Sequence, residues 1–273
     1  MKSTSLNQPS EATSIINSLV QSSSIMRKTV EHIMVSVSEK DMNPDVELSI
    51  TPKLNSESSL VVMAPGQSTF KHLPYDTPGK PIKLKLDLVP KECRIYVMLD
   101  VLLTESILAE KVDRGIEDTI VEFISKEDTA FFNNLFDAKH LINSNRVKIT
   151  PENLVSEVER VHERTGVLPA VAYLFTDTDQ DISDVLSLMV ATLPKSVAIN
   201  TVPIECLGLD KKENVIIMLP PPEAFGVMYS SMLPTLDVSE EVNHVYSGKR
   251  ICISVLDSSV MLIQDIKVVS LLC

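Results

Sequence analysis

The chain has 273 residues, of which 44% are apolar and only 4% aromatic, and its 37 acidic and 25 basic side chains give a formal charge of −12. The apolar share excludes a wholly disordered chain, and with no run of about 18 apolar residues the sequence predicts no membrane-spanning helix. The Ser- and Thr-rich start also lacks the apolar stretch of a secretory signal.

Residues 1–45 predict an N-terminal arm. The first 25 residues contain eight Ser and two Thr, a composition typical of a mobile or partner-ordered terminus. Apolar residues from Ile15 to Ile33 nevertheless recur at helical spacing. Part of the arm is therefore expected to form an amphipathic helix that packs on the body of the protein or on a neighbouring subunit.

Residues 46–103 predict strands. Apolar and polar residues alternate over 46–50 and again over 82–88, where Lys83 and Lys85 separate apolar neighbours. Such alternation is typical of a half-exposed antiparallel strand. Proline and glycine between the two segments indicate a long excursion instead of a tight hairpin. The region is predicted to hold an extended loop and the first strands of a sheet.

Residues 104–138 carry the strongest helical pattern. Apolar residues repeat every four positions from Leu108 to Ile124, and the stripe resumes at Phe131. A helix of about thirty residues is roughly 45 Å long, far longer than average, which suits a scaffold for its domain. A short strand is predicted to follow near Arg146–Ile149.

Residues 150–225 predict alternating helices and strands. Its first helix has Thr150 as N-cap and Gly166 just past its end. A buried strand is predicted at Val171–Phe175 and a helix at Ile182–Leu193. Two further strand candidates follow, Ala198–Val202 and Val215–Leu219.

Residues 226–273 predict further strands. Ile251–Leu256 alternates apolar and polar positions, Asp257-Ser258-Ser259 predicts a turn, and Val260–Ile263 and Ile266–Val269 predict returning strands. We expect these strands to share a sheet with those that precede the long helix. The protein is therefore predicted to be α+β.

Several kinds of chemical site are absent from the sequence. The 7 glycines form neither a GxGxxG nor a Walker loop, and the GxSxG motif of serine hydrolases does not occur. The 4 cysteines form no CxxC pair and have no histidine at ligand spacing. We therefore expect no cofactor, no metal and no catalytic residues.

The acidic segment Asp177–Asp184 is the one cluster that suggests metal binding. Its alternate carboxylates begin like a calcium loop, but Ile182 stands where that loop needs glycine, and Leu188 where it needs glutamate. The preferred interpretation is a polar turn in which Asp181 caps the next helix. The alternative is a metal-dependent enzyme or regulatory domain that uses these acids.

Three segments resemble the major capsid proteins of tailed bacteriophages, which have the Hong Kong 97-type shell fold. The stretch from Val112 to Phe132 is similar to the family's long helix, which ends in an acidic pair, a small residue and Phe-Phe. The strand at 215–219, its following prolines and Gly226-Val227 are similar to the family's return into its peripheral domain. The terminal strands are the third likeness, although Asp257-Ser258-Ser259 replaces the family's frequent Asn-Pro turn.

The resemblance implies a division into five parts. These are an N-terminal arm (1–45), an extended β loop with the first peripheral strands (46–103), a peripheral domain with the spine helix (104–149), an axial α/β domain (150–225) and C-terminal peripheral strands (226–273).

The resemblance also implies a function. A non-enzymatic protein of this family self-assembles through hexamers and pentamers into an icosahedral phage head, and it encloses double-stranded DNA without sequence-specific binding. Scaffolding, portal and decoration proteins are expected partners, no membrane is involved, and assembly is expected in the host cytoplasm before the protein resides in the virion. The related alternative is an encapsulin-type compartment that holds a cargo enzyme.

The negative charge lies entirely after residue 100. Residues 1–100 hold 11 basic and 11 acidic side chains, whereas residues 101–273 hold 14 and 26. In the family the extended loop crosses a neighbouring subunit, so a basic loop on an acidic helix would steer assembly. The predicted contact residues are Lys71, Lys80, Lys83, Lys85, Lys91 and Arg94 with Glu110, Glu117, Asp118 and Glu122. The alternative is two ordinary solvated faces.

Overall fold

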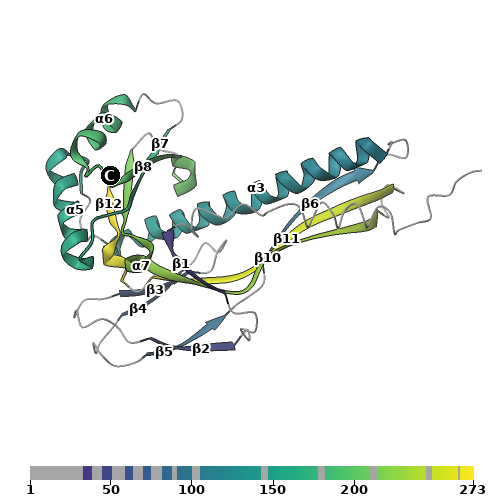
Figure 1. Cartoon of the computed structure of the whole chain (residues 1–273), viewed down its shortest axis with the longest axis horizontal. Coiled ribbons are helices and arrows are strands. Elements are labelled where there is room, and N and C mark those ends of the chain that lie inside the picture. Colours follow the sequence, from purple (N-terminus) through teal and green to yellow (C-terminus); the bar gives the residue numbers. More distant parts are fainter. Residues whose placement is uncertain are drawn as a thin grey trace, which may run out of the picture. The chain divides into compact units, whose positions relative to one another are not determined.

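A computed structural model describes residues 33–38, 45–50, 59–63, 70–74, 82–87, 91–99, 105–142, 147–177, 182–209, 214–243, 248–263 and 265–273. The chain forms two compact units, each assembled from segments that are distant in sequence (Figure 1). The first unit includes residues 90–125 and 232–258, and the second includes residues 28–89, 126–231 and 259–273. The helix predicted within the N-terminal arm lies largely outside the described residues.

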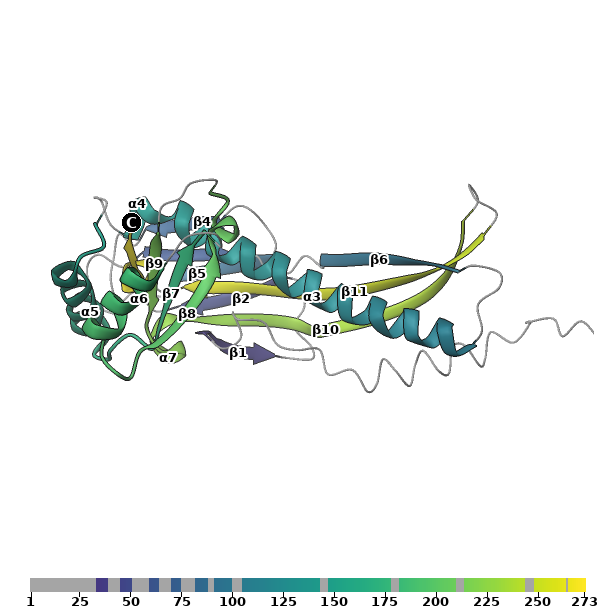
Figure 2. The same ribbon diagram turned by 90° about the horizontal axis from the view of Figure 1, so that it is seen from above.

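The first unit combines the start of the long helix with long antiparallel strands. Helix α3 (Glu105–Asp137) confirms the helix predicted from its four-residue repeat. Strand β6 (Lys91–Leu99) pairs antiparallel with β11 (Gly248–Ile263), and β10 (Gly226–Asn243) is the next strand of this sheet. Figure 2 shows α3 running alongside these three strands.

The same sheet continues into the second unit. Its strand order there is β1 (Val35–Ser38), β10, β11, β3 (Ser59–Met63) and β4 (Phe70–Pro74). Strand β1 is parallel to β10, whereas β3 is antiparallel to both β11 and β4. The prediction that strands before the long helix share a sheet with C-terminal strands is therefore confirmed.

A separate two-stranded sheet pairs the two alternating segments of the predicted loop. Strand β2 (Asp45–Ile50) is antiparallel to β5 (Ile82–Asp87). The register sets apolar positions opposite one another, as at Leu48 and Leu84, and it sets Glu47 opposite Lys85. The alternation in the sequence thus correctly indicated antiparallel strands.

The second unit also contains a four-stranded sheet in the order β12 (Ser270–Leu272), β9 (Val215–Leu219), β7 (Val171–Thr176) and β8 (Ala198–Pro203). Strands β7 and β8 are parallel, and the other pairs are antiparallel. Helix α5 (Pro151–Thr165) precedes β7, and α6 (Ser183–Thr192) connects β7 to β8. The predicted caps of α5 are confirmed, because the Thr150 hydroxyl accepts a hydrogen bond from the Asn153 amide and Gly166 has a φ of 78°.

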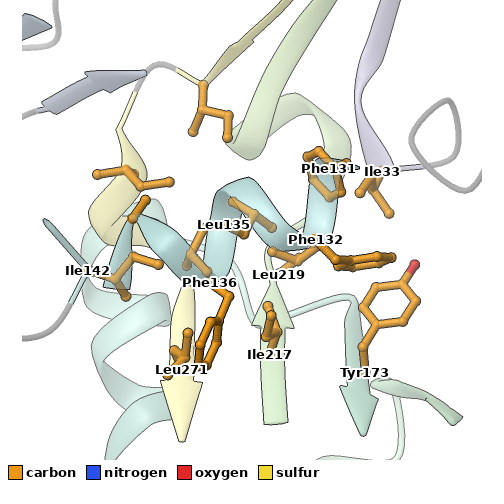
Figure 3. Close-up of a cluster of buried hydrophobic side chains, with 14 of the residues drawn as sticks. Ile33, Phe131, Phe132, Leu135, Phe136, Ile142, Tyr173, Ile217, Leu219 and Leu271 are labelled. Atoms are coloured by element: carbon orange, nitrogen blue, oxygen red, sulfur yellow. The ribbon is translucent and has the colours of Figure 1, made fainter. Parts of the chain in front are cut away.

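Two apolar clusters fill the two faces of this four-stranded sheet. On one face, Leu154 and Val158 of α5 and Met189 of α6 pack with Leu174 and Ile216 of the strands. The other face meets the C-terminal part of α3, together with α4 (Lys139–Ile142) (Figure 3). None of the helices within the described ranges is long and apolar enough to cross a membrane.

The Phe-Phe pair at the end of the long helix lies at the centre of the larger cluster. The ring of Phe132 lies 5.0 Å from the ring centroids of both Tyr173 and Phe175, with its plane tilted steeply to theirs. Phe131 makes a similar edge contact with Phe225 at 6.3 Å. Edge-to-face pairs of this kind add about 0.5–1.5 kcal/mol each beyond burial. The motif therefore fastens α3 to the four-stranded sheet.

The sequence prediction for the C-terminal segment is partly wrong. No turn interrupts β11 at Asp257-Ser258-Ser259, because the strand pairs with β6 up to Asp257 and with β3 from Met261. Pairing with two partners in succession outweighs the local turn preference of these polar residues. Ile266–Val268 forms a 3₁₀ helix instead of a strand, and β12 at Ser270–Leu272 joins β9.

Candidate assembly interfaces

The part of α3 in the first unit has one buried and one exposed face. Val112, Ile116, Ile120 and Phe123 are buried at helical spacing. Thr119 is buried on the same face, and its hydroxyl donates a 2.6 Å hydrogen bond to the Gly115 carbonyl within the helix. Because one stripe of the helix packs against the rest of the protein, the polar residues of the helix are concentrated on the opposite stripe.

The exposed face carries the predicted acidic contacts. Glu110, Glu117 and Asp118 are exposed, and Glu122 is half-buried. Lys111 and Arg114 share this stripe, so the face is acidic but not uniformly so. Val121 is also on it and is 65% exposed, as single apolar side chains on protein surfaces often are.

The structure distributes the predicted basic residues over several strands. Lys71 is exposed on β4, and Lys83 and Lys85 lie at alternate positions of β5, all in the second unit. Lys91 and Arg94 lie on β6 in the first unit, where their Cα partners on β11 are Asp257 and Ser254. These residues therefore form two sets within one chain. Lys80 lies outside the described residues.

The segment Asp177–Asp184 is only partly described. Asp177 is half-buried after β7, residues 178–181 lie outside the described residues, and α6 begins at Ser183. The N-cap residue of α6 is Ile182, which makes no side-chain capping hydrogen bond, and the predicted cap Asp181 is among the residues not described. The described ranges contain no group of three or more His, Cys, Asp or Glu residues arranged to hold a metal ion.

A polar network that sequence reasoning missed joins α5 to the C-terminal segment. The carboxylate of Glu157 is buried and accepts hydrogen bonds from Arg160 at 2.7 and 2.9 Å and from the Ser270 hydroxyl at 2.6 Å. Arg160 also donates to the carbonyls of Lys267 and Val269. The i,i+3 spacing of Glu157 and Arg160 was a signal for a local pair. It contained no information about Ser270.

Beside this network, Arg164 forms an ion pair with Asp265 at 2.7 Å. The Asp265 carboxylate also accepts from the backbone amide of Lys267 and so caps the 3₁₀ helix. After β12, the amide of Cys273 donates to the Val147 carbonyl at 2.8 Å. The described residues from 265 to 273 are thus anchored at several points to α5 and the sheet.

One histidine of the second unit lies in an unfavourable setting for a positive charge. His72 on β4 is half-buried, and its Nε2 is buried with no hydrogen-bond partner. Burial, and secondarily the neighbouring His140 of α4, lower the pKa of His72. Protonation of this side chain is therefore coupled to the packing of β4 and α4.

Solved structures similar to this chain include those of phages, of a virus-like particle and of an encapsulin complex. A structure of Microbacterium phage Oxtober96 has a TM-score of 0.50 at 11% sequence identity, and the match covers 88% of this chain and 86% of that chain. A virus-like particle from Pyrococcus furiosus matches at TM-score 0.49 and 10% identity over 95% and 96% of the two chains. The mature capsid of bacteriophage PhiM1 matches at TM-score 0.46 and 11% identity over 92% and 88%.

At identities this low the likeness concerns the fold alone. Neither a family model nor a curated protein matches the sequence. The order of the elements and the phage match at TM-score 0.50 give the chain a Hong Kong 97-like capsid fold of mixed helix and strand.

Proposed function

We infer that this chain is the major capsid protein of a tailed bacteriophage, which self-assembles into an icosahedral shell around double-stranded DNA. The observation that supports this function is the capsid fold, in which the first part of α3 lies in one compact unit with β6 and parts of β10 and β11 and has an exposed face. Such a protein acts through repeated, symmetric contacts between copies of itself. Its role is structural, and we propose no catalytic residue, cofactor or metal for it.

We also propose a role for each part of the chain within the shell. We propose that α3 is the spine helix of a peripheral domain and that the four-stranded sheet with α5 and α6 forms the axial domain. Hexamers and pentamers of the chain would be the building blocks. Scaffolding, portal and decoration proteins are proposed as further partners, and assembly is proposed to take place in the host cytoplasm.

The contact between copies is proposed to pair opposite charges. The exposed acids Glu110, Glu117 and Asp118 on α3 would receive the basic positions of β5, Lys83 and Lys85, from a neighbouring copy. The remaining residues proposed for the two sides are Glu122 of α3 with Lys71, Lys80, Lys91 and Arg94. Because exposed pairs contribute only about 0–1 kcal/mol each, their effect is to steer and register the copies.

The same charge balance bears on the enclosed nucleic acid. Protein–DNA binding depends on Lys and Arg to neutralise phosphates, and this chain has a formal charge of −12. A predominantly acidic shell would hold DNA by enclosure, without sequence-specific contacts.

Electron microscopy and nuclease protection of particles purified from an infected or expressing host would test the function. Shells that protect double-stranded DNA are the expected result. Shells that contain a protein cargo and no DNA would identify an encapsulin-type compartment instead. A chain that forms no particle, but loses a measurable activity when Asp177 is replaced, would support the metal-dependent alternative.

A further inference from the structure

Residues 265–273 follow β11 and link the six-stranded sheet to the four-stranded sheet. Their 3₁₀ helix, η2 (Ile266–Val268), contacts β3 of the six-stranded sheet and also contacts α4 and α5. Strand β12 then pairs with β9 at the edge of the four-stranded sheet. We call residues 265–273 the clasp, because this one segment contacts elements of both sheets.

The side chains that anchor the clasp lie on one stripe of α5. Glu157, Arg160 and Arg164 recur at the i, i+3, i+7 spacing of a single helical face. Each bonds to polar groups of the clasp. In the same order, these groups are the Ser270 hydroxyl, the carbonyls of Lys267 and Val269, and the Asp265 carboxylate. Helix α5 therefore carries a docking stripe for the clasp.

The rest of the second unit has most of its core without the clasp. Of the ten buried residues in the cluster that α5 and α6 form with the four-stranded sheet, only Leu272 belongs to the clasp. The larger cluster has 26 buried residues, of which the clasp contributes Ile266, Val268, Val269 and Leu271. Figure 3 shows Leu271 within this larger cluster. Strands β9, β7 and β8 are also paired with one another independently of β12.

Docking of the clasp is finely balanced. Ordering its nine residues costs conformational entropy, and burying its five apolar side chains gives a hydrophobic gain of the same order. The bonds from α5 therefore decide whether the clasp stays closed. Segments with such a balance can open locally while the remaining structure stays folded.

We propose that the clasp opens as a unit while the rest of the chain stays folded, and that only chains with a closed clasp assemble. Opening removes the link that η2 makes between β3 and α5, so copies with an open clasp do not share one arrangement. Symmetric assembly requires the same contacts from every copy. The protein concentration needed for assembly should therefore rise in inverse proportion to the closed fraction. The proposal rests on the shell function inferred above and adds a control on it.

Hydrogen exchange of the unassembled full chain in increasing urea tests whether the clasp opens separately. After correction for intrinsic rates, the amides of β12 should exchange at least about tenfold faster than those of β7. Their exchange should also depend less on urea, because a local opening exposes little surface. Equal rates and equal urea dependence in β12 and β7 would mean that the clasp opens only by global unfolding, and the proposal would be wrong.

A charged substitution that holds the clasp open tests the control of assembly. Leu271→Asp places a carboxylate where the side chain is 4% exposed, so closure would bury an unpaired charge. The variant should lose amide protection in β12, keep it in β7, and need at least about tenfold more protein to form particles in light scattering. Val155→Asp is the matched control, because it adds the same charge at a 44% exposed position of α5 outside the docking stripe, and it should change neither property.

The outcomes separate the proposal from the shell function. Loss of β7 protection in Leu271→Asp would show that the clasp does not open independently. Normal assembly of Leu271→Asp with an unprotected β12 would show that closure does not control assembly. Either result overturns the proposal and leaves the shell function intact. Failure of the unmodified chain to form particles would instead contradict the shell function.

Discussion

The carboxylate of Glu157 on α5 accepts a 2.6 Å hydrogen bond from the hydroxyl of Ser270, a residue 113 positions later in the chain. Both residues are buried, and Arg160 completes the network by donating to the same carboxylate oxygen. The network therefore holds the C-terminal strand β12 to a helix that precedes the four-stranded sheet in the sequence.

Removal of the Glu157 carboxylate should destabilise the second unit. Glu157→Ala leaves Arg160 without its ion-pair partner and the buried Ser270 hydroxyl without an acceptor, which should lower the free energy of unfolding by about 2–3 kcal/mol. Chemical denaturation measures the change. Glu159→Ala is the matched control because Glu159 is exposed on the same helix, and it should change stability by less than about 0.5 kcal/mol. Equal effects of the two substitutions would contradict the role of the network.

Gly226 at the start of β10 should tolerate no side chain. A Cβ atom there would lie 2.6 Å from the Leu262 carbonyl oxygen of β11, and backbone of a paired strand has little room to move. Gly226→Ala should therefore lower the free energy of unfolding by about 1–3 kcal/mol through overpacking. Thermal unfolding of the purified chain measures the loss.

Gly166 serves as the control for Gly226. Gly166 has a φ of 78°, but no atom lies within 4 Å of the position that a Cβ atom would take there, so its requirement is conformational and not steric. Gly166→Asn should cost well under about 1 kcal/mol, since Asn tolerates the left-handed conformation. If Gly226→Ala proved as mild as Gly166→Asn, the close approach of β10 and β11 would be wrong.

Stability should fall in mild acid because of His72. Its pKa is lowered in the folded state, so the unfolded chain binds the proton more tightly. The folded state therefore keeps its full stability above the ordinary histidine pKa of about 6.5 and loses it as the pH falls through the lowered value. Urea denaturation as a function of pH should show this loss, and His72→Gln should flatten it.

Two causes lower the pKa of His72, its burial and the neighbouring His140, and the same experiment can separate them. His140→Gln removes the neighbouring charge but leaves the burial of His72, which is the larger cause. The pKa of His72 should therefore rise only slightly, and the acid-induced loss of stability should become only slightly smaller. An unchanged pH profile in His72→Gln would show that another group governs acid stability.

Charge reversal on β5 should impair assembly without unfolding the chain. Lys83→Glu with Lys85→Glu would present acids to the proposed acidic face of α3, and like charges slow association most at low salt. Light scattering at low and high ionic strength measures the defect, and Glu117→Lys with Asp118→Lys should rescue it. Lys148→Glu, an exposed residue outside the proposed contact, is the control. Normal particle yield from the β5 variant at low salt would refute the pairing.

Sequence patterns correctly predicted the elements in which the spacing of apolar residues or the capping residues match the structure. The four-residue apolar repeat of α3 coincides with its buried stripe of Val112, Ile116 and Ile120. Thr150 and Gly166 mark the ends of α5 because capping depends on neighbouring backbone groups. Pattern and structure agree wherever the determining interactions lie within one turn or one strand.

Elements determined by distant partners could not be predicted in this way. The polar run Asp257-Ser258-Ser259 has the composition of a turn, but pairing with β6 and then β3 extends β11 through it. The Glu157–Ser270 contact depends on two segments more than a hundred residues apart.

The most direct test of the shell function is the mass of the purified full chain in solution, measured by multi-angle light scattering. A self-assembling capsid protein should give particles in the megadalton range, with smaller capsomers at low protein concentration. A single species near the chain mass of 30.2 kDa across all concentrations and salt conditions would contradict the shell function.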